Sequence, residues 1–184
     1  MTEDIALVQR ICKGDAVAFE QLLNDYGGLV KHLVSRYTVH QQESEDLIQE
    51  IFIDIYKGVH GFKGQSSLKT WIYRVSLNHC LRHAERQKPA NLEFNEAAAM
   101  VSSNSLSPHE SLERGETKKK VTQALSHLSD IHRSVIVLHE LNGLTFKECA
   151  EVLDVPVGTV KSRLSNAFGK LRPLLLPYKE ECSK

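Results

Sequence analysis

Two stretches of the chain carry side chains suited to holding nucleic acid, and the first covers residues 62–74. It interleaves cations, hydroxyls and aromatic rings, and more polar and cationic residues follow. Cations follow a phosphate backbone, while aromatic faces accept unstacked bases, so the pattern predicts single-strand capture. The candidates are Lys63, Ser66, Ser67, Lys69, Trp71, Tyr73, Arg74, Asn78, Arg82 and Arg86. In the alternative interpretation, Trp71 and Tyr73 are ordinary core residues.

The second stretch has the pattern of a helix-turn-helix over residues 145–172. Thr145 and Glu148 form a capping-box pair, and Asp154-Val155-Pro156 predicts a break between two helices. The second helix would bury Val157, Val160, Leu164, Ala167, Phe168 and Leu171. Its other side is small and polar, with Lys161 and Arg163 at the edges, and no acidic residue occurs over 155–178. Such a surface suits the major groove of duplex DNA.

A third helical pattern, over residues 43–57, is acidic on one face. Its apolar residues share one side, and Asp46, Gln49, Glu50 and Asp54 lie on the other. A solvated acidic face is the plain alternative. The distribution of charge along the chain favours a binding role for this face. Residues 1–56 carry a net −6, 57–92 a net +6, 93–117 a net −4 and 118–184 a net +4. These blocks predict two anionic contacts and at least one different partner surface.

The elements that would position these side chains are all helical. Apolar residues recur three and four apart over 15–38, 43–57 and 68–86, and again over 117–128, 130–142 and 145–172. Residues 91–117 are rich in Ser and Ala, with few large apolar side chains, which is typical of a linker. The prediction is an all-α protein: two small helical domains joined by a flexible acidic linker, the C-terminal one a helix-turn-helix.

The amino-acid composition excludes several other classes of protein. The 184 residues are 41% hydrophobic and 25% charged, as in globular proteins, and no apolar run approaches the roughly 18 residues of a membrane span. The acidic start has no signal-peptide pattern, so secretion is not expected. The four scattered cysteines are expected to be free and mostly buried thiols of a reducing cytosol.

A metalloenzyme is one alternative, because His79 and His83 stand at helical ligand spacing with Cys80 beside them. The pair lacks a glutamate base between them and sits in a basic helix. Ordinary polar helix residues are therefore expected here, with no metal, no cofactor and no catalytic residue.

Three motifs together resemble the extracytoplasmic-function group of bacterial sigma factors. They are Glu45–Phe52 (EDLIQEIF), Phe62–Val75 (FKGQSSLKTWIYRV) and Val155–Leu164 (VPVGTVKSRL). The resemblance covers nearly the whole chain outside the linker. Three motifs in order, at the right separations, are far more specific than a helix-turn-helix alone.

This resemblance implies a region-two domain at 1–90, a linker at 91–116, a region-four domain at 117–178 and a tail at 179–184. It also implies a function without enzymatic activity: binding core RNA polymerase, melting the promoter near its start site and reading its upstream element. Residues 63–86 would hold the melted non-template strand. Polymerase would be bound by Asp46, Leu47, Gln49, Glu50, Ile53 and Asp54. Upstream duplex would be bound by Thr145, Gly158, Thr159, Lys161, Ser162, Arg163, Ser165, Asn166 and Lys170.

The same resemblance implies a cytoplasmic protein controlled by an anti-sigma partner, which would hold it at the inner membrane in some cases. Departures from the family pattern concern Asn166 and Phe168, where Arg is frequent, Leu68, where Phe is common, and Gly27-Gly28, expected to interrupt the first long helix. The alternative function is a dimeric helix-turn-helix operator-binding regulator. It would need a sensing domain, and residues 1–90 lack the strand and helix alternation of a receiver.

Overall fold

Helices and turns make up the described parts of the chain, which are residues 2–38, 40–87 and 124–181 of this computed structural model. None of these residues is in a strand, so the predicted all-α class is confirmed. Within these ranges no helix is both long and apolar enough to cross a membrane. The expected linker at 91–116 lies outside the described residues. The helices are α1 (Thr2–Cys12), α2 (Ala16–Val34), α3 (Gln41–Gly58), η1 (Val59–Gly61), α4 (Leu68–Gln87), α6 (Asp130–Ile136), η2 (Val137–Leu141), α7 (Phe146–Leu153) and α8 (Val157–Glu181).

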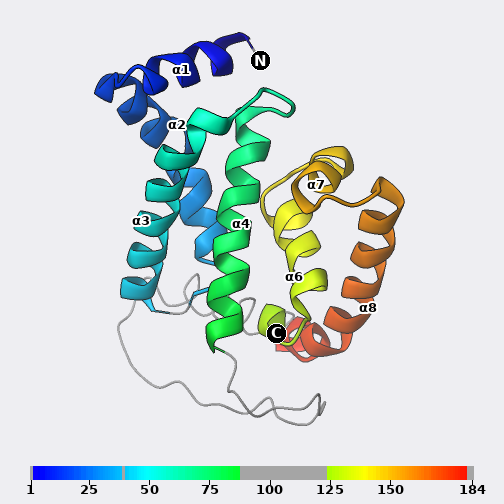
Figure 1. The fold of residues 1–184 in the computed structure, drawn as a ribbon. Coiled ribbons are helices and arrows are strands. Elements are labelled where there is room, and N and C mark those ends of the chain that lie inside the picture. The colour runs from blue at the N-terminus through cyan, green and yellow to red at the C-terminus, as the bar shows by residue number, and fades with distance from the viewer. Residues whose placement is uncertain (1, 39, 88–123, 182–184) are drawn as a thin grey trace.

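The N-terminal unit consists of α1 to α4, with α2, α3 and α4 packed on one another and α1 lying across one end (Figure 1). Their inward stripes form a core of fully buried side chains, among them Leu22, Leu33, Ile51, Ile55, Ile72 and Leu77. The helices expected over 15–38, 43–57 and 68–86 are therefore confirmed. The expected interruption at Gly27 and Gly28 is wrong, because α2 runs straight through both residues. Burial of the apolar stripe on either side outweighs the low helix propensity of two glycines.

Local capping fixes where these helices begin. The Asp15 carboxylate accepts a hydrogen bond from the Ala18 amide at the start of α2, and the Arg10 side chain donates to it at 2.9 Å. These bonds stabilise the ionised form and lower the pKa of Asp15. At α4 the Leu68 amide donates to the Asp4 carboxylate, and the Thr70 amide donates to the Ser67 hydroxyl. The N-terminal helix thereby fixes the start of α4.

The C-terminal unit consists of α6, η2, α7 and α8, with α6 and α7 both packed on α8. η2 is a π-helical turn that prolongs α6, and the Asn142 side chain donates to the Val137 carbonyl at its end. Gly143 then adopts a positive φ of 67°, which allows the chain to reverse before α7. The helix expected at 130–142 is therefore α6 followed by this wider turn.

α8 is longer than expected, because it continues to Glu181 through Pro173 and Pro177 and into the predicted tail. A proline lacks one amide donor, but its φ is already helical, so a helix can continue past it with a bend. The cysteine expectation holds for Cys80 and Cys149, which are buried, whereas Cys12 is exposed. Burial raises the pKa of the Cys80 thiol to about 12 and that of Cys149 to about 11.

Candidate polymerase and nucleic-acid interfaces

The acidic face of α3 points away from the core of the N-terminal unit. Asp46, Gln49, Glu50 and Asp54 are exposed, and Ile53 retains 45% of its accessible surface on the same face. Leu47, which was expected to belong to this face, is buried in the core. Tyr56 was not among the sequence candidates, yet it is 46% exposed three residues after Ile53. Its helical spacing from Ile53 was the signal that could have identified it.

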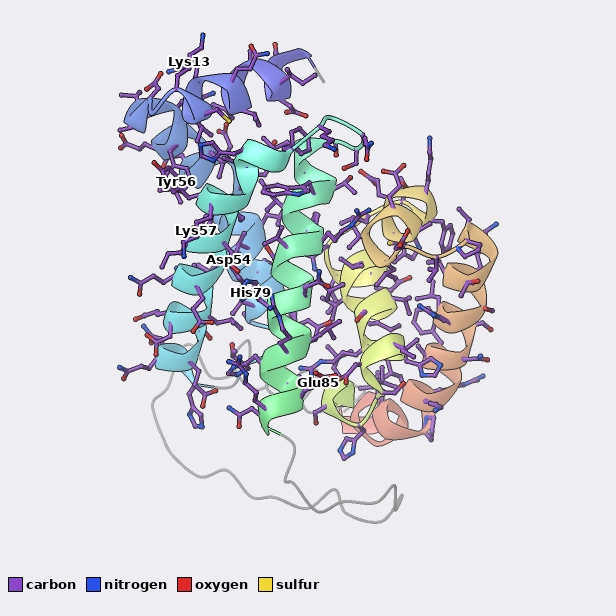
Figure 2. All side chains as sticks on the ribbon, viewed as in Figure 1. Lys13, Asp54, Tyr56, Lys57, His79 and Glu85 are labelled. Atoms are coloured by element: carbon purple, nitrogen blue, oxygen red, sulfur yellow. The ribbon has the colours of Figure 1, made fainter. Side chains whose placement is uncertain are left out.

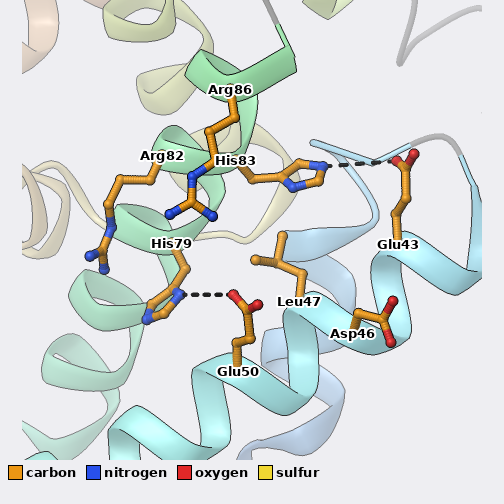
Figure 3. A pocket seen from close by; sticks show the side chains of 8 residues that line it. All are labelled: Glu43, Asp46, Leu47, Glu50, His79, Arg82, His83 and Arg86. Carbon is orange, nitrogen blue, oxygen red and sulfur yellow. Dashed lines mark ion pairs between the residues drawn. The ribbon is translucent and has the colours of Figure 1, made fainter.

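A hollow of about 190 Å³ separates the acidic side of α3 from the basic end of α4, and Figure 3 shows the side chains around it. Two histidines of α4 face carboxylates of α3. His79 Nε2 lies 2.9 Å from Asp54 Oδ2, and His79 Nδ1 lies 4.0 Å from Glu50. His83 lies 3.8 Å from Glu43. The hollow is lined by Glu43, Asp46, Leu47, Glu50, His79, Arg82, His83 and Arg86.

These contacts bear on the metal alternative. Cys80, which stands between the two histidines in the sequence, is fully buried, so its thiol does not join them. In the described ranges, no three His, Cys, Asp or Glu side chains are grouped so that they would hold a metal ion. The histidines instead link the two helices through carboxylates, and Figure 2 shows Asp54 and His79 turned toward one another.

The predicted single-strand face centres on Trp71. Its ring packs at a tilt on Phe62 with centroids 5.7 Å apart, and it lies close to Gly58, where an added Cβ would be 3.3 Å from the indole. Trp71 remains half-buried at the edge of an open hollow of about 400 Å³. That hollow is lined by Asp54, Lys57, Gly58, Trp71, Val75, Asn78, His79 and Arg82. Three sequence candidates, Trp71, Asn78 and Arg82, thus meet there, and Lys57 and Val75 were missed.

The other candidates on this face do not line that hollow. Ser66 and Ser67 are half-buried and hydrogen-bonded locally, to the Ser67 carbonyl and the Thr70 hydroxyl respectively. Tyr73 is only 3% exposed, and its hydroxyl donates to Asn142 in the C-terminal unit. The cations among them are all exposed: Lys63, Lys69, Arg74 and Arg86. The structure therefore exposes the cations while covering one of the two candidate rings.

The helix-turn-helix consists of α7 and the first half of α8. The turn between them is closed by Asp154 in the left-handed conformation, with φ 52°. An L-residue tolerates this conformation best when it is Asn or Asp. Exposed on α8 are Gly158, Lys161, Ser162, Ser165, Asn166 and Lys170, with Thr159 and Arg163 half-buried. Val160, Leu164, Ala167 and Leu171 are buried as expected, but Phe168 is 46% exposed and Val157 is exposed as well.

Thr145 serves the geometry of this motif. Its hydroxyl accepts from the Glu148 amide, while its own amide and hydroxyl donate to the Glu148 carboxylate at 2.8 Å, so the predicted capping box is confirmed. Behind α7, His139 stacks on Phe146 with centroids 4.2 Å apart, and Lys161 of α8 reaches over the same ring at 5.5 Å. These contacts fix the angle at which the two helices meet.

The capping box predicts an acid-sensitive stability. Hydrogen bonds from Thr145 lower the pKa of Glu148 below its usual 4.5. The ionised carboxylate therefore stabilises the folded state fully above the unfolded-state pKa, and this stabilisation is lost as the pH falls through the folded-state pKa. We expect Glu148→Gln to lower the free energy of unfolding by roughly 0.3–1 kcal/mol at neutral pH, because Gln can keep the capping-box hydrogen bond but loses the negative charge at the helix N-terminus. Urea unfolding from pH 7 toward pH 3 should show the difference from wild type shrinking. Glu20→Gln, an exposed glutamate of α2, is the control; an equal deficit at every pH would contradict the prediction.

Known families match both units of the chain. The Sigma-70 region 2 model matches residues 22–89, and the Sigma-70, region 4 model matches residues 118–171. The chain is 30% identical to the RNA polymerase sigma-H factor of Pseudomonas aeruginosa, covering 97% of each protein. It is 34% identical to the ECF RNA polymerase sigma-E factor of Escherichia coli, covering 94% of this chain and 96% of that one.

Two solved structures share the fold. One is CnrH in complex with the cytosolic domain of CnrY, at TM-score 0.72, 24% identity and coverage of 94% of this chain and 96% of that one. The other is the sigma factor RpoE with the anti-sigma factor NepR from Bartonella quintana, at TM-score 0.63, 23% identity and coverage of 85% and 96%. The alternative of a dimeric operator-binding regulator is not favoured by any of these likenesses. The chain belongs to the extracytoplasmic-function (ECF) sigma factors, which bind core RNA polymerase and direct it to promoters.

Proposed function

We propose that residues 1–90 form the domain that binds core RNA polymerase and opens the promoter, and that residues 117–178 bind the upstream promoter element. One observation supports this division most strongly. The acidic face of α3 and the cationic, aromatic side of α4 lie side by side on the N-terminal unit. The C-terminal unit, which contains the helix-turn-helix, has exposed cations of its own. The N-terminal unit therefore has two different surfaces: the acidic face of α3 suits a basic protein partner, and the cationic side of α4 suits an anionic strand.

The individual roles follow from exposure. Polymerase is contacted by Asp46, Gln49, Glu50, Ile53 and Asp54, with Tyr56 added by its exposure and Leu47 supporting them from the core. The melted strand is held around the hollow of Trp71, Asn78 and Arg82, with Lys63, Lys69 and Arg86 along its backbone. Upstream duplex is contacted by the exposed polar side of α8.

The mechanism that we propose involves no bond-making step and no cofactor. The chain contributes sequence selection and a binding site for the open strand. Each base that stacks on an aromatic ring gains about 1–3 kcal/mol, which offsets the few kcal/mol of unstacking. The protein acts in the cytoplasm, and an anti-sigma protein restrains it. Solved relatives support that last point, because RpoE of Bartonella quintana is seen bound to the anti-sigma factor NepR.

The proposal is tested by promoter selection. Core polymerase of Escherichia coli, with and without the chain, transcribes a random-sequence duplex library, and the templates of the resulting transcripts are sequenced. We expect templates sharing two short elements to be enriched only when the chain is present. Permanganate should then mark unpaired thymines near the start site of an enriched template. Transcripts that are the same with and without the chain would refute the proposal.

A salt titration tests the role of α8. Each phosphate contact contributes about 0.9 to the slope of log K against log salt. We expect Lys161→Ala to reduce that slope by about 0.9 on an enriched upstream duplex, measured by fluorescence anisotropy. Lys147→Ala, an exposed lysine of α7 outside the proposed contacts, should leave the slope unchanged. A slope that is the same for Lys161→Ala and wild type would remove Lys161 from the interface.

A further inference from the structure

His79 of α4 lies between the two candidate interfaces of the N-terminal unit. It lines both the hollow beside the acidic side of α3, drawn in Figure 3, and the hollow that contains Trp71. Its side chain is largely enclosed and retains 11% of its accessible surface. The roles proposed above do not use His79, because it is neither a polymerase contact nor a strand contact. Its function therefore has to be inferred from the groups that it faces.

The imidazole of His79 contacts two carboxylates of the proposed polymerase-binding face. Its Nε2 lies 2.9 Å from Asp54 Oδ2, and its Nδ1 lies 4.0 Å from Glu50 Oε2. The side chains of Asp54 and Glu50 are 47% and 61% exposed, so a partner protein can reach both carboxylates while the imidazole stays covered. A ring with a carboxylate beside each nitrogen suits the protonated form, because only that form donates from both nitrogens.

The other charged groups around His79 come from the same two helices. Among the described residues, both hollows are lined by α3 and α4 with the start of η1 beyond them, so α2 and α7, which also pack on α4, place no charged group there. Histidine is the side-chain type whose charge ordinarily changes between about pH 5 and 8. The charged and titratable groups of the two hollows are Glu43, Asp46, Glu50, Asp54 and Lys57 of α3 and His79, Arg82, His83 and Arg86 of α4.

The two histidines of this set differ in the carboxylates that they face. His83 Nε2 lies 3.8 Å from Glu43 Oε2, and Glu43 is not among the proposed polymerase contacts. A proton gained by His79 therefore adds positive charge directly beside two polymerase contacts, whereas a proton gained by His83 adds it beside another carboxylate. The same helix thus contains a histidine with the proposed role and a matched histidine without it.

We propose that His79 is a proton-dependent counter-charge of the polymerase-binding face, acting on Asp54 and Glu50. Neutral His79 leaves the negative charge of both carboxylates uncompensated. Protonated His79 places a positive charge beside them and weakens their attraction for a basic partner surface, which slows association. Polymerase therefore binds the chain more slowly as the pH falls from 8 to 6. This inference rests on the proposed polymerase-binding role of α3, whereas the pairing of His79 with Asp54 does not.

Nuclear magnetic resonance of the free full-length chain tests the pairing without polymerase. The carboxyl-carbon signal of Asp54, assigned by its loss in Asp54→Asn, is followed from pH 8 to pH 6. We expect this signal to shift over that range in the wild type and in His83→Gln, because the charge beside the carboxylate changes. In His79→Gln it should stay constant. A signal that moves equally in the wild type and in His79→Gln would overturn the pairing and the inference with it.

Association with core polymerase of Escherichia coli tests the consequence. Surface plasmon resonance at low salt gives the association rates of the wild type and His79→Gln at pH 8 and pH 6. Titrating groups of the polymerase affect both proteins alike, so the ratio of the two rates is the readout. We expect equal rates at pH 8. At pH 6 the wild type should be up to about threefold slower, the factor that Coulomb's law in water gives for two unit charges about 6 Å apart. His83→Gln, the matched control, should follow the wild type at both pH values.

A permanent charge separates this effect from a merely structural one. His79→Lys keeps its positive charge at both pH values, so we expect it to associate more slowly than His79→Gln at pH 8 as well as at pH 6. Circular dichroism checks that each variant is folded.

The possible failures are distinguishable. Equal rates of the wild type and His79→Gln at both pH values would overturn the inference and leave polymerase binding intact. A change in His83→Gln as large as that in His79→Gln would also overturn it, because net charge would then govern the rate. No binding of the wild type at either pH would refute the proposed polymerase-binding role and, with it, this inference.

Discussion

Trp71→Ala is expected to lower promoter opening by the polymerase holoenzyme by about 5- to 140-fold. The indole is half-buried beside Phe62, at the edge of the hollow that also contains Asn78 and Arg82. Removing it takes away one stacking surface, worth about 1–3 kcal/mol per base, and each 1.4 kcal/mol is a factor of ten. Permanganate reactivity of thymines on an enriched promoter measures the open fraction.

The control for this prediction is Trp71→Phe, which keeps an aromatic face and should retain most of the opening. Trp71 is the one tryptophan of the chain, so its fluorescence reports directly on bases added as a single-stranded oligonucleotide to free protein. Quenching is expected in the wild type. Wild-type opening by Trp71→Ala, after circular dichroism has shown that the variant is folded, would mean that Trp71 is only a core residue.

Asp46→Lys is expected to weaken binding to core polymerase by at least about tenfold. Asp46 is exposed on the acidic face of α3, which would meet a basic surface of the polymerase. Replacing an attraction by a like-charge contact costs more than the loss of the attraction alone, and it slows association most at low salt. Surface plasmon resonance at two salt concentrations measures both the association rate and its salt dependence.

Glu45→Lys provides a closely matched control. It makes the same change of charge one residue earlier on the same helix, about 100° around the axis, where Glu45 is exposed beside Gln41. We expect Glu45→Lys to bind polymerase almost as well as wild type. Equal losses in both variants would show that net charge, rather than the proposed face, governs the affinity.

Local patterns in the amino-acid sequence predicted several features of the fold. The stripes over 43–57 and 68–86 predicted α3 and α4, and Thr145 with Glu148 predicted the start of α7. These signals are short-range, since helix periodicity and capping depend on residues three or four apart. For the same reason the family could be identified from three short motifs, each of which is continuous in the sequence.

Errors arose where long-range packing decided the outcome. Leu47 was placed on a partner surface but is buried, while Phe168 was placed in the core but is exposed. Both lie at the border of an apolar stripe, where a rotation of a few tens of degrees decides between core and solvent. Nothing within one helix specifies that rotation, because the neighbouring helices set it.

The sequence by itself determined the helices, their polar faces and the sigma-factor family. Only the tertiary structure decided which candidates are available, since Tyr73 and Arg74 contact Asn142 and Glu151, which lie more than sixty residues away in the chain. It also decided that His79 and His83 of α4 face carboxylates of α3. Such contacts depend on how whole helices dock, and docking is governed by the summed burial of many side chains, which no single motif records.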